Sequence, residues 1–439
     1  MRPKIIRDPI HNIVPFDNSN CDELLLSLIN TKEFQRLRRI RQLGMCDLVF
    51  PGASHSRFSH SIGVMRIAKR ILERIEAVQG KKLDELDRKV TLVSALLHDI
   101  GHGPFSHAFE KITKKDHERY SVEMILNQGT EVHKELLKVD SQLPSAVASF
   151  LSLLVTGHGT KMPNYLKQIV SSQLDADRFD YLLRDSHFTG TEYGKYDLEW
   201  LVEHLLIDSD LKILYLDRKS IPAIEGYIFA RFHMYRAVYF HKTVRSAEIM
   251  LRLLFKRIEK IVKSRKDVWP DILPDAPKLI VDALSGENIS INDYIKLDDA
   301  VALSLCHACR TAKDPILSAL GCGLLDRKLY KSIELPSDDY SKNTAFRDAV
   351  RKGLENQSEE IEYLFIDDSA SDTPYRPYEP DQEAAAISKS IFVENAGSGL
   401  KEISQTSEAV QALTKKYQII RHYFPERLKN IVDINREKV

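Results

Sequence analysis

Three histidines and one aspartate that can bind a metal ion or move a proton lie within ten residues of one another: His98, Asp99, His102 and His107. Apolar residues lead into the adjacent His98-Asp99 pair, and Gly101 then interrupts the pattern, which places the pair at the end of a helix. An imidazole beside a carboxylate supplies half of the ligands of a divalent-metal site. The two later histidines are then available for proton transfer or phosphate contact.

The remaining ligands of such a site must come from other parts of the chain. One candidate is His60, which opens an amphipathic segment and can face a cleft from the start of a helix. Another is Asp177. If residues 175–185 are helical, Asp177, Tyr181, Arg184 and Asp185 share one face, because they are separated by four, seven and eight residues.

Hydrophobic residues recur at three- and four-residue steps along three segments, and this periodicity predicts the helices that position these side chains. The stripe at 62–78 follows His60, and the stripe at 86–97 ends at the His98-Asp99 pair. A third stripe, at 166–174, leads to Asp177. The candidate ligands therefore lie at the ends of separate helices that must pack together.

We predict a mostly α-helical fold, with a helical core, small β-hairpins and a mixed α+β C-terminal region. The expected divisions are a strand and turn segment at 1–21, a helical catalytic core at 22–265, and an α+β region at 266–439 for oligomerisation or regulation. The stretch from Trp269 to Pro277 contains several prolines and favours a break near the second boundary. Smaller elements expected within these regions are a strand at 211–216, one long helix from Pro222 to about Lys263, helices at 278–285, 295–312, 314–321 and 341–354, strand-like runs at 361–366 and 390–394, and a loop at 367–381.

The composition is that of a globular protein, and it excludes some function classes. The 63 basic residues balance the 63 acidic ones, so no overall positive field gathers nucleic acid, although a local basic groove is still compatible with the sequence. No run approaches the length of a membrane span, the N-terminus does not resemble a signal peptide, and the five cysteines do not form a disulfide framework. We therefore expect a cytoplasmic protein with no membrane partner. Cys306 and Cys309 are interpreted as ordinary helix residues, with zinc or redox chemistry as the alternative.

The motifs around these ligands resemble those of the HD-domain phosphohydrolases. His60, the His98-Asp99 pair and Asp177 match the metal signature of that superfamily. The stretches 50–60 and 96–107 more narrowly resemble the catalytic core of the deoxynucleoside triphosphate triphosphohydrolases, a branch that includes the sterile-alpha-motif/HD protein and bacterial deoxyguanosine triphosphatases. The similarity covers residues 4–260 and continues more thinly at 324–334 and 372–375.

This resemblance implies a role for each matching residue. His60, His98, Asp99 and Asp177 would bind the metal; His102, His107, Glu110 and His117 would surround the scissile phosphate, with His107 as proton donor. The implied substrate contacts are Gln42, Leu43, Arg57, Arg178, Tyr181, Asp185, Arg231, Tyr235 and Tyr239. On a single long helix, Arg231, Tyr235, Tyr239 and Lys242 would form one stripe, a spacing that by itself fits a clamp for phosphate and sugar.

A regulatory nucleotide is a further implication of the resemblance. In the family, the region that includes the basic run at 32–41 helps to build a nucleotide site between subunits, and Lys4, Gln35 and Arg38 fit that role. The alternative is that this run is a solvated face. Asn30 stands where the family's guanine-reading aspartate is expected, and an amide lacks the second acceptor oxygen of a carboxylate. Activation by guanosine triphosphate is therefore not expected to transfer to this chain.

The function that the resemblance implies is metal-dependent hydrolysis of deoxynucleoside triphosphates to deoxynucleoside and inorganic triphosphate, with water attacking the α-phosphorus. Histidine and aspartate ligands suit Mn, Mg, Fe, Ni, Co or Zn, so the sequence does not identify the ion. We expect a homo-oligomer, either a dimer or a tetramer. The alternatives are another HD phosphohydrolase (acting on nucleotide monophosphates, cyclic nucleotides or alarmones) and a nucleotide-sensing or nucleic-acid-binding module. The base preference stays open, because Tyr235 and Phe240 replace polar residues of the family.

Overall fold

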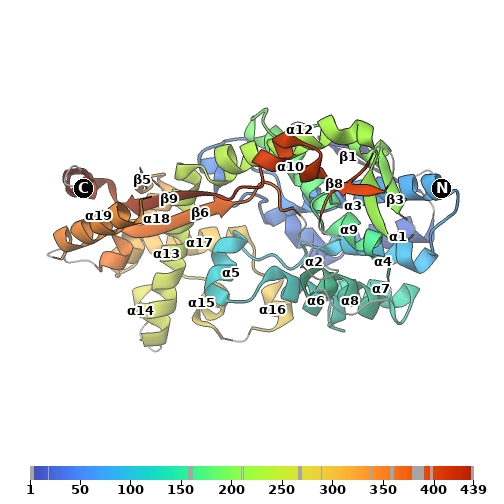
Figure 1. Cartoon of the computed structure of the whole chain (residues 1–439). Coiled ribbons are helices and arrows are strands. Elements are labelled where there is room, and N and C mark those ends of the chain that lie inside the picture. The colour runs from blue at the N-terminus through green and yellow to red at the C-terminus, as the bar shows by residue number, and fades with distance from the viewer. Residues whose placement is uncertain are drawn as a thin grey trace.

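The computed structural model describes residues 4–436, apart from 18, 157–161, 209, 211, 265–268, 288, 337–338, 356–359, 378–389 and 396–398. Helices dominate these residues, and the strands gather in small sheets (Figure 1). This arrangement confirms the predicted mostly α-helical class with a mixed C-terminal region.

An antiparallel β-hairpin precedes the helices. Strand β1 (Lys4–Asp8) pairs with β2 (Asn12–Phe16), and the turn between them is closed by Asp8, whose Oδ1 accepts the amides of Ile10 and His11. Asp8 itself is buried against the helical core. It is one of the small β-hairpins of the predicted fold, and it fixes the position of His11.

Three helices position the candidate ligands: α3 (Arg57–Gln79), α4 (Glu85–Leu97) and α10 (Ala176–Thr189). Helix α3 packs against both of the others. It ends at Gly80, whose φ of 64° is readily adopted only by glycine. The other helices and helical turns of this half are α1 (Asn20–Ile29), α2 (Lys32–Gln35), η1 (Arg36–Arg39), η2 (Cys46–Leu48), α5 (His107–Thr113), α6 (His117–Leu126), α7 (Glu131–Val139), α8 (Leu143–Thr156), α9 (Asn164–Val170), α11 (Leu198–Glu203) and η3 (Arg218–Ser220).

The long helix expected from Pro222 to Lys263 is interrupted, so that prediction was wrong in its middle. Helix α12 (Ile221–Met234) gives way to a π-helical turn, η4 (Tyr235–Tyr239), and α13 (Lys242–Ser264) begins only after it. A π-helical turn inserts extra backbone into the helical repeat and shifts every later side chain around the axis. The stripe from Arg231 to Lys242 therefore does not lie on one straight face.

The C-terminal half continues the helical packing. Helices overlap the four predicted segments, with ends that differ by a few residues. The elements are α14 (Trp269–Ile272), α15 (Lys278–Ser285), α16 (Ile291–Tyr294), α17 (Asp299–Arg310), α18 (Pro315–Leu325), α19 (Tyr340–Gly353), α21 (Glu408–Ala412) and α22 (Lys429–Arg436), with short turns η5 (Ile361–Tyr363), η6 (Ile403–Gln405) and η7 (Glu426–Leu428).

Two strand predictions in this half need correction. The strand-like run at 361–366 begins as the helical turn η5, and the predicted loop at 367–381 begins as strand β6 (Ile366–Asp372). Pairing with β9 (Tyr417–Phe424) explains the second difference. The sequence of this segment is polar and typical of a loop, but the partner strand satisfies its backbone hydrogen bonds. The last part of that loop, 378–381, lies outside the described residues.

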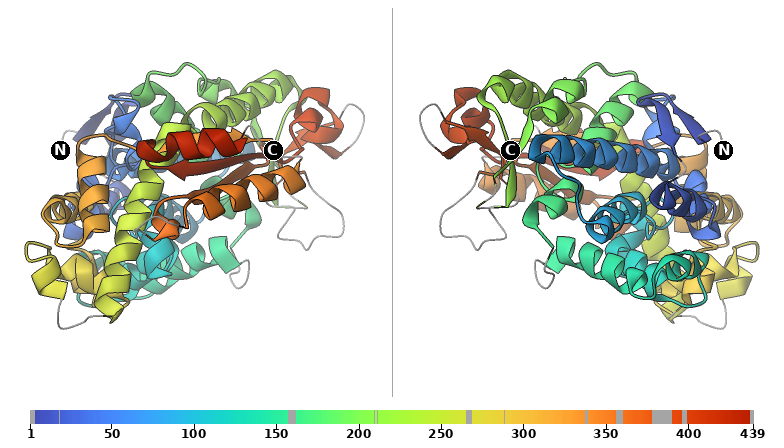
Figure 2. Two further views of the ribbon diagram at one scale, coloured as in Figure 1. Left: turned by 90° about the vertical axis from the view of Figure 1, so that its left-hand side faces the viewer. Right: turned by 90° about the vertical axis from the view of Figure 1, so that its right-hand side faces the viewer.

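Two sheets contain the strands of the C-terminal half, and the first of them also joins that half to the rest. In one, β3 (Leu205–Asp208) and β4 (Ile213–Leu216) form a hairpin, and β7 (Phe392–Glu394) joins β4 in parallel, followed by β8 (Leu400–Glu402). In the other, β9 lies between β5 (Lys331–Leu335) and β6. Helices α19 and α22 pack beside this second sheet (Figure 2) around Phe346, Phe424 and Val432.

The large hydrophobic core extends from the hairpin through α18 and beyond. Helix α13 packs against α5, α15 and α18, so the C-terminal helices share this core with the helices that carry the candidate site. Cys306 and Cys309 are buried in α17, and burial raises the pKa of the Cys306 thiol to about 12. Their burial in an apolar helix favours the interpretation of both as ordinary helix residues.

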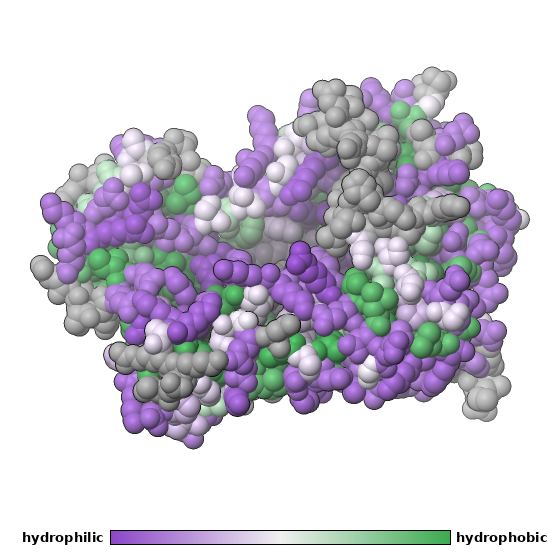
Figure 3. All heavy atoms as spheres, turned by 90° about the horizontal axis from the view of Figure 1, so that it is seen from below, coloured by the Kyte–Doolittle hydropathy of each residue, from purple (hydrophilic) through white to green (hydrophobic). Residues whose placement is uncertain are grey.

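Polar side chains dominate the face of the molecule shown in Figure 3, and the apolar side chains on it form small separate groups. Among the described residues, no helix combines the length and the apolar character that are needed to cross a bilayer.

Gly63 marks a close approach of α3 to α10 and provides a test of this packing. A Cβ atom there would lie 1.8 Å from Asp180 Oδ1 and 2.6 Å from Arg184 Nη2. We expect Gly63→Ala to lower the free energy of unfolding by about 3 kcal/mol, because it pushes apart a buried charge pair. Gly226→Ala is the matched control. Its Cβ meets nothing within 4 Å in α12, so it should stabilise the protein by about 0.5–1 kcal/mol. Denaturant unfolding of both variants checks this, and equal stability of the two would refute the close approach.

Candidate metal centre and its cavity

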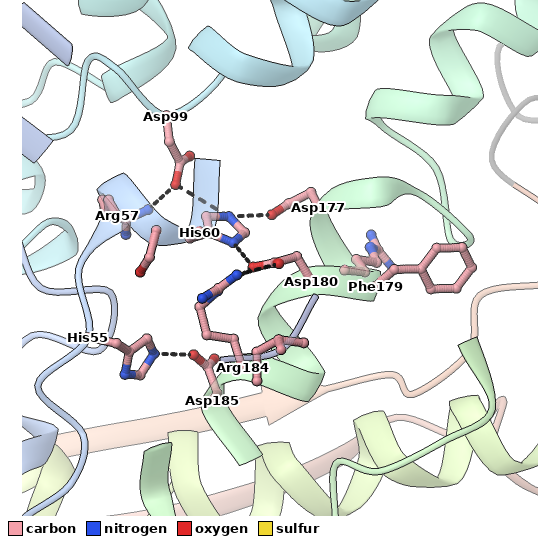
Figure 4. Close-up of polar contacts among 12 residues, drawn as sticks. His55, Arg57, His60, Asp99, Asp177, Phe179, Asp180, Arg184 and Asp185 are labelled. Atoms are coloured by element: carbon pink, nitrogen blue, oxygen red, sulfur yellow. Dashed lines mark hydrogen bonds and ion pairs between the residues drawn. The ribbon is translucent and has the colours of Figure 1, made fainter. Parts of the chain in front are cut away.

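The four predicted ligands come together at the ends of three helices. His60 lies in the first turn of α3, His98 and Asp99 follow the end of α4, and Asp177 lies in the first turn of α10. His60 Nε2 is 3.0 Å from Asp177 Oδ1 and 3.7 Å from Asp99 Oδ2 (Figure 4). His98 Nε2 is 3.4 Å from Asp99 Oδ1 and 3.6 Å from Asp177 Oδ1.

Both histidines present the same nitrogen to this centre, because the other nitrogen is already held. His60 Nδ1 lies 2.8 Å from Asp180 Oδ2, and His98 Nδ1 lies 2.9 Å from the carbonyl of Ala95. The two Nε2 atoms are buried, and neither makes a well-directed hydrogen bond within the described part of the chain. Metal-binding histidines show this pattern, in which a second group fixes the ring and leaves one nitrogen for the ion. Two imidazole nitrogens and two carboxylates fit a divalent cation.

Asp180 is a residue that sequence reasoning missed. Its carboxylate is completely buried, and it accepts hydrogen bonds from Nε and Nη2 of Arg184. The same carboxylate contacts His60 Nδ1 and lies 2.6 Å from Nε2 of His11. Arg184 also donates to Asp8 of the N-terminal hairpin. Arg184 is therefore held by two carboxylates and, unlike Asp177, does not line the cavity described below. The four-residue spacing of Asp180 and Arg184 on a helix was the available signal for this pair.

The charges around the centre hold its groups in defined protonation states. Burial alone would lower the pKa of the His60 imidazole, but the neighbouring carboxylates of Asp177 and Asp180 raise it to about 10. Burial would raise the pKa of Asp177, whereas His60 and His98 hold it well below its usual range. The pKa of Asp99 is likewise low despite burial, because His98, Arg57 and His102 surround it. Both carboxylates are thus ionised and ready to bind a cation.

A second group of side chains adjoins the metal centre through Asp99. His102 Nε2 lies 3.3 Å from Asp99 Oδ1, and the His102 and His117 rings stack with centroids 3.6 Å apart. Glu110 Oε1 is 3.2 Å from His102 Nδ1 and 2.9 Å from His117 Nδ1. Asp99, His102 and His117 could themselves hold an ion. His107 begins α5, but its side chain lies outside the described residues, so its role as proton donor stays a prediction.

Burial and neighbouring charges shift the pKa values of the two stacked histidines in opposite directions. Burial and the nearby cations Arg57 and His117 lower the pKa of His102 to about 4. Burial also opposes the charged form of His117, but its hydrogen bond with Glu110 and the charge of Asp99 raise the pKa of that imidazole. At neutral pH, His102 is therefore neutral, and His117 holds a proton more readily.

A cavity of about 690 Å³ opens beside these groups. Its wall includes the two metal-site carboxylates and most of the predicted substrate contacts, and it adds three cations that sequence reasoning missed. The predicted residues in the wall are Gln42, Leu43, Arg57, Asp99, His102, Glu110, His117, Asp177, Arg178, Tyr181, Asp185, Tyr235 and Tyr239, and the additional cations are Lys111, Arg245 and Arg252. The wall thus combines a metal centre, imidazoles and positive charge.

Asp185 is held from two sides at the cavity wall. The Tyr239 hydroxyl donates to Asp185 Oδ2 at 2.8 Å, and His55 Nε2 lies 2.7 Å from Asp185 Oδ1. His55 is itself buried and stacks on the ring of Phe188. Nearby, the buried Oε1 of Gln42 accepts no hydrogen bond within the described residues. Sequence reasoning missed His55 because its partner lies 130 residues away.

Arg231 is placed differently from the other predicted substrate contacts. Its guanidinium pairs with Asp372, donates to the carbonyls of Thr373 and Pro374, and lies over the ring of Tyr235. It does not line the described cavity. The π-helical turn that follows Met234 explains why Tyr239 faces the cavity while Arg231 does not.

The three residues predicted for a regulatory nucleotide lie outside this cavity lining. Gln35 Nε2 donates to the Ile29 carbonyl, Arg38 Nε donates to Gln35 Oε1, and the Arg38 guanidinium lies 3.5 Å above the ring of Phe58. Lys4 is exposed at the start of β1. Their regulatory role stays a prediction.

Comparison with known families places the HD signature on the same residues. Residues 57–185 match the HD domain, and residues 196–268 match the HD associated region. Uncharacterized protein YwfO of Bacillus subtilis is 34% identical over 428 residues, which cover 97% of this chain and 93% of that protein. The deoxynucleoside triphosphate triphosphohydrolase SAMHD1 homolog of Dictyostelium discoideum is 32% identical, over 75% of this chain and 60% of that protein.

Solved structures share the fold over nearly the whole chain. A phosphohydrolase from Bacteroides thetaiotaomicron has a TM-score of 0.78 at 24% identity, covering 96% of this chain and all of that one. A hypothetical protein from Aquifex aeolicus has a TM-score of 0.75 at 25% identity, covering 99% of each chain.

Removal of one imidazole tests the metal centre. We expect His98→Ala to stay folded but to bind divalent metal about 100-fold more weakly, because the ion loses one of its two imidazole ligands. His204→Ala, at a histidine that follows α11 and whose Nδ1 contacts only the nearby Trp200 carbonyl, is the matched control and should retain the metal. The metal content of both variants is measured by mass spectrometry after dialysis against limiting metal, and circular dichroism checks that they are folded. Full occupancy in His98→Ala would show that the ligand assignment is wrong.

The raised pKa of His60 predicts that metal binding depends on pH. The metal-free imidazole stays protonated up to about pH 10, so an ion must displace a proton to reach Nε2. Metal affinity should rise with pH between about 7 and 9, with release of about one proton at pH 7. Stability of the metal-free protein should follow the opposite trend: the contribution of His60 is complete below the ordinary imidazole pKa of 6.5 and is lost as pH approaches 10.

Calorimetric titration in buffers of different ionisation enthalpy measures this proton release directly. An observed binding enthalpy that does not change with the buffer would mean that His60 is already neutral at that pH, which contradicts a pKa raised to about 10.

Proposed function

Because the chain belongs to the HD-domain phosphohydrolase family, we propose that it hydrolyses deoxynucleoside triphosphates to a deoxynucleoside and inorganic triphosphate. The observation that carries this proposal is the composition of one cavity. Its wall joins the carboxylates of the metal centre, an imidazole and glutamate group, and the Asp185–Tyr239 pair. A deoxynucleoside triphosphate needs three such surroundings, for its α-phosphate, its leaving oxygen and its sugar.

The phosphate end of the cavity is defined by charge. A divalent ion bound there would lower the pKa of water and neutralise phosphoryl charge. Arg57 is fixed beside the centre because it pairs with Asp99 and donates Nε to Ser106 Oγ at 3.0 Å. Arg178 lines the same wall and, with Arg57, offers planar donor pairs that suit phosphate oxygens. Attack of water at the α-phosphorus would then leave the triphosphate held by these cations.

The departing 5′-oxygen needs a proton at the same end. His102 does not carry that proton near pH 7, because its pKa lies at about 4. We assign the transfer to His107, which precedes Glu110 by one helical turn, with His117 and Glu110 in support. Neutral His102 is suited to orient Asp99 or a phosphate oxygen, since it can donate one hydrogen bond without adding charge.

The sugar end is defined by hydrogen-bonding groups. Asp185 can accept a bond from a 3′-hydroxyl, and the unused Oε1 of Gln42 offers a second acceptor in the same wall. Tyr239 is fixed by its bond to Asp185, so its ring can pack against the deoxyribose and leave no room for a 2′-hydroxyl. The SAMHD1-like relatives carry the triphosphohydrolase name and support this substrate class. Homo-oligomer formation and a regulatory nucleotide remain predictions.

Product analysis tests the reaction. Purified protein incubated with each deoxynucleoside triphosphate and Mn²⁺ or Mg²⁺ should release the deoxynucleoside and intact triphosphate, and ribonucleoside triphosphates should react at least about tenfold more slowly. Appearance of diphosphate or single phosphate would rule out cleavage at the α-phosphorus. Cleavage of monophosphates, cyclic nucleotides or alarmones in preference to triphosphates would favour one of the other HD phosphohydrolase activities.

The contact with the 3′-hydroxyl is tested by removing each partner in turn. Asp185→Asn should lower kcat/KM for a deoxynucleoside triphosphate about 10- to 100-fold, which corresponds to a lost hydrogen bond to a charged group. The dideoxy substrate should cost the wild-type enzyme a similar factor, and Asp185→Asn should add little on that substrate, because the contact is already gone. Asp271→Asn, on exposed α14, is the matched control. Independent, multiplicative losses would contradict the contact.

A further inference from the structure

The loop between α4 and α5 brings His102 to the metal centre. It covers residues 98–106, and its end has an unfavourable backbone: φ is 49° at Phe105 and 44° at Ser106. Residues other than glycine rarely adopt this left-handed backbone conformation, so neighbouring groups must hold the loop in place. Ser106 immediately precedes α5, which carries Glu110.

The carboxylate of Asp299 holds the strained end of this loop. Its Oδ1 accepts the amide of Phe105 at 2.7 Å, and its Oδ2 accepts the amide of Arg41 at 2.9 Å. Asp299 is buried, and it stands at the start of α17, 194 residues after Phe105. One side chain thus joins the loop to the segment that carries Gln42.

Two further side chains, Tyr294 and Arg36, tether the same loop to the same C-terminal segment. The Tyr294 hydroxyl donates to the Gly101 carbonyl at 2.8 Å. The completely buried Arg36 donates Nε to the Leu297 carbonyl at 2.8 Å, and its other nitrogens donate to the carbonyls of Ile100 and His102. Residues 294–299 therefore fix the loop at both its beginning and its end.

The packing around these tethers leaves the loop little freedom to shift. A Cβ atom at Gly103 would lie 2.9 Å from the Tyr294 hydroxyl and 2.8 Å from Phe109. The Tyr294 ring stacks on Tyr120 with centroids 3.6 Å apart, and the Arg36 guanidinium lies over the Tyr294 ring, 5.1 Å from its centroid. A movement of residues 294–299 would consequently move the loop with it.

The segment 294–299 lies outside both matched family regions, which end at residues 185 and 268. We propose that Asp299 is a positioning residue for the phosphohydrolase reaction: by fixing the Phe105 backbone, it sets the placement of His102 and α5 against the metal centre. This inference rests on the proposed function for the reaction, but the loop contact can be measured without it. The C-terminal half then does more than complete the core, because it holds part of the reaction site.

Asp299→Asn is the direct test. The side-chain amide keeps the size of the carboxylate but replaces one of its two acceptor oxygens with a donor, which then faces a backbone N–H. We expect kcat for the deoxynucleoside triphosphate to fall about 10- to 100-fold through displacement of the loop, with KM and metal content within about twofold of wild type. Hydrogen exchange of residues 100–106 should accelerate, while exchange in α3 stays unchanged.

Asp298→Asn is the matched control. Asp298 caps α17 through the amides of Ala300 and Val301 and pairs with Arg39, so it serves the same helix end without touching the loop. It should leave kcat and exchange at 100–106 within about twofold of wild type, because asparagine also caps helices. A loss of kcat in Asp298→Asn equal to that in Asp299→Asn would mean that α17 acts only through stability, and would overturn the proposal.

Tyr294→Phe provides a second, milder variant in case Asp299→Asn does not fold. It keeps the ring but removes the hydroxyl that donates to the Gly101 carbonyl, and it should lower kcat about threefold to tenfold with unchanged metal content. A variant that folds, binds metal and shows faster exchange at 100–106 but keeps wild-type kcat would overturn the proposal. If wild-type protein hydrolyses no deoxynucleoside triphosphate, the proposed function fails by itself. Exchange at 100–106 then still decides whether Asp299 holds the loop.

Discussion

The buried carboxylate of Asp180 is the constraint on which the rest of the site depends. It is fully removed from solvent, and an isolated charge in such a place is strongly unfavourable, so it must be matched by cations and donors. Arg184, His60 and His11 supply them. Loss of one partner of a buried ion pair typically costs about 3–5 kcal/mol, so helix α10, helix α3 and the N-terminal hairpin cannot shift independently. The orientation of the His60 ring follows from this arrangement.

A second carboxylate, Asp99, connects the two halves of the reaction site. Its Oδ2 faces His60 and Arg57, and its Oδ1 faces His98 and His102. Asp99 therefore belongs both to the candidate metal centre and to the group formed by His102, Glu110 and His117. The cavity wall also includes Asp185 of α10 and Tyr239 of the π-helical turn, so both elements help to shape it.

Much of this site could be predicted from the sequence, because its ligands lie beside strong helical patterns and within motifs that resemble a known family. His60, the His98-Asp99 pair and Asp177 do meet as predicted. The supporting residues were harder to predict. Asp180 and His55 act through partners that lie far away in the sequence. Arg36 belongs to the basic run at 32–41, for which a solvated face was the alternative interpretation, and it is completely buried against the loop at 98–106. The π-helical turn and strand β6 depend on tertiary packing, which local periodicity does not report.

We propose that one cavity places a metal-bound phosphate and a deoxyribose at opposite ends. The most direct test is a crystal structure of the metal-loaded protein with a non-hydrolysable deoxynucleoside triphosphate analogue, with the ion located by anomalous scattering. We expect one anomalous peak among His60, His98, Asp99 and Asp177, with the α-phosphate beside it and the 3′-oxygen within hydrogen-bonding distance of Asp185. An ion bound elsewhere, or an analogue whose sugar lies away from Asp185, would contradict this proposal.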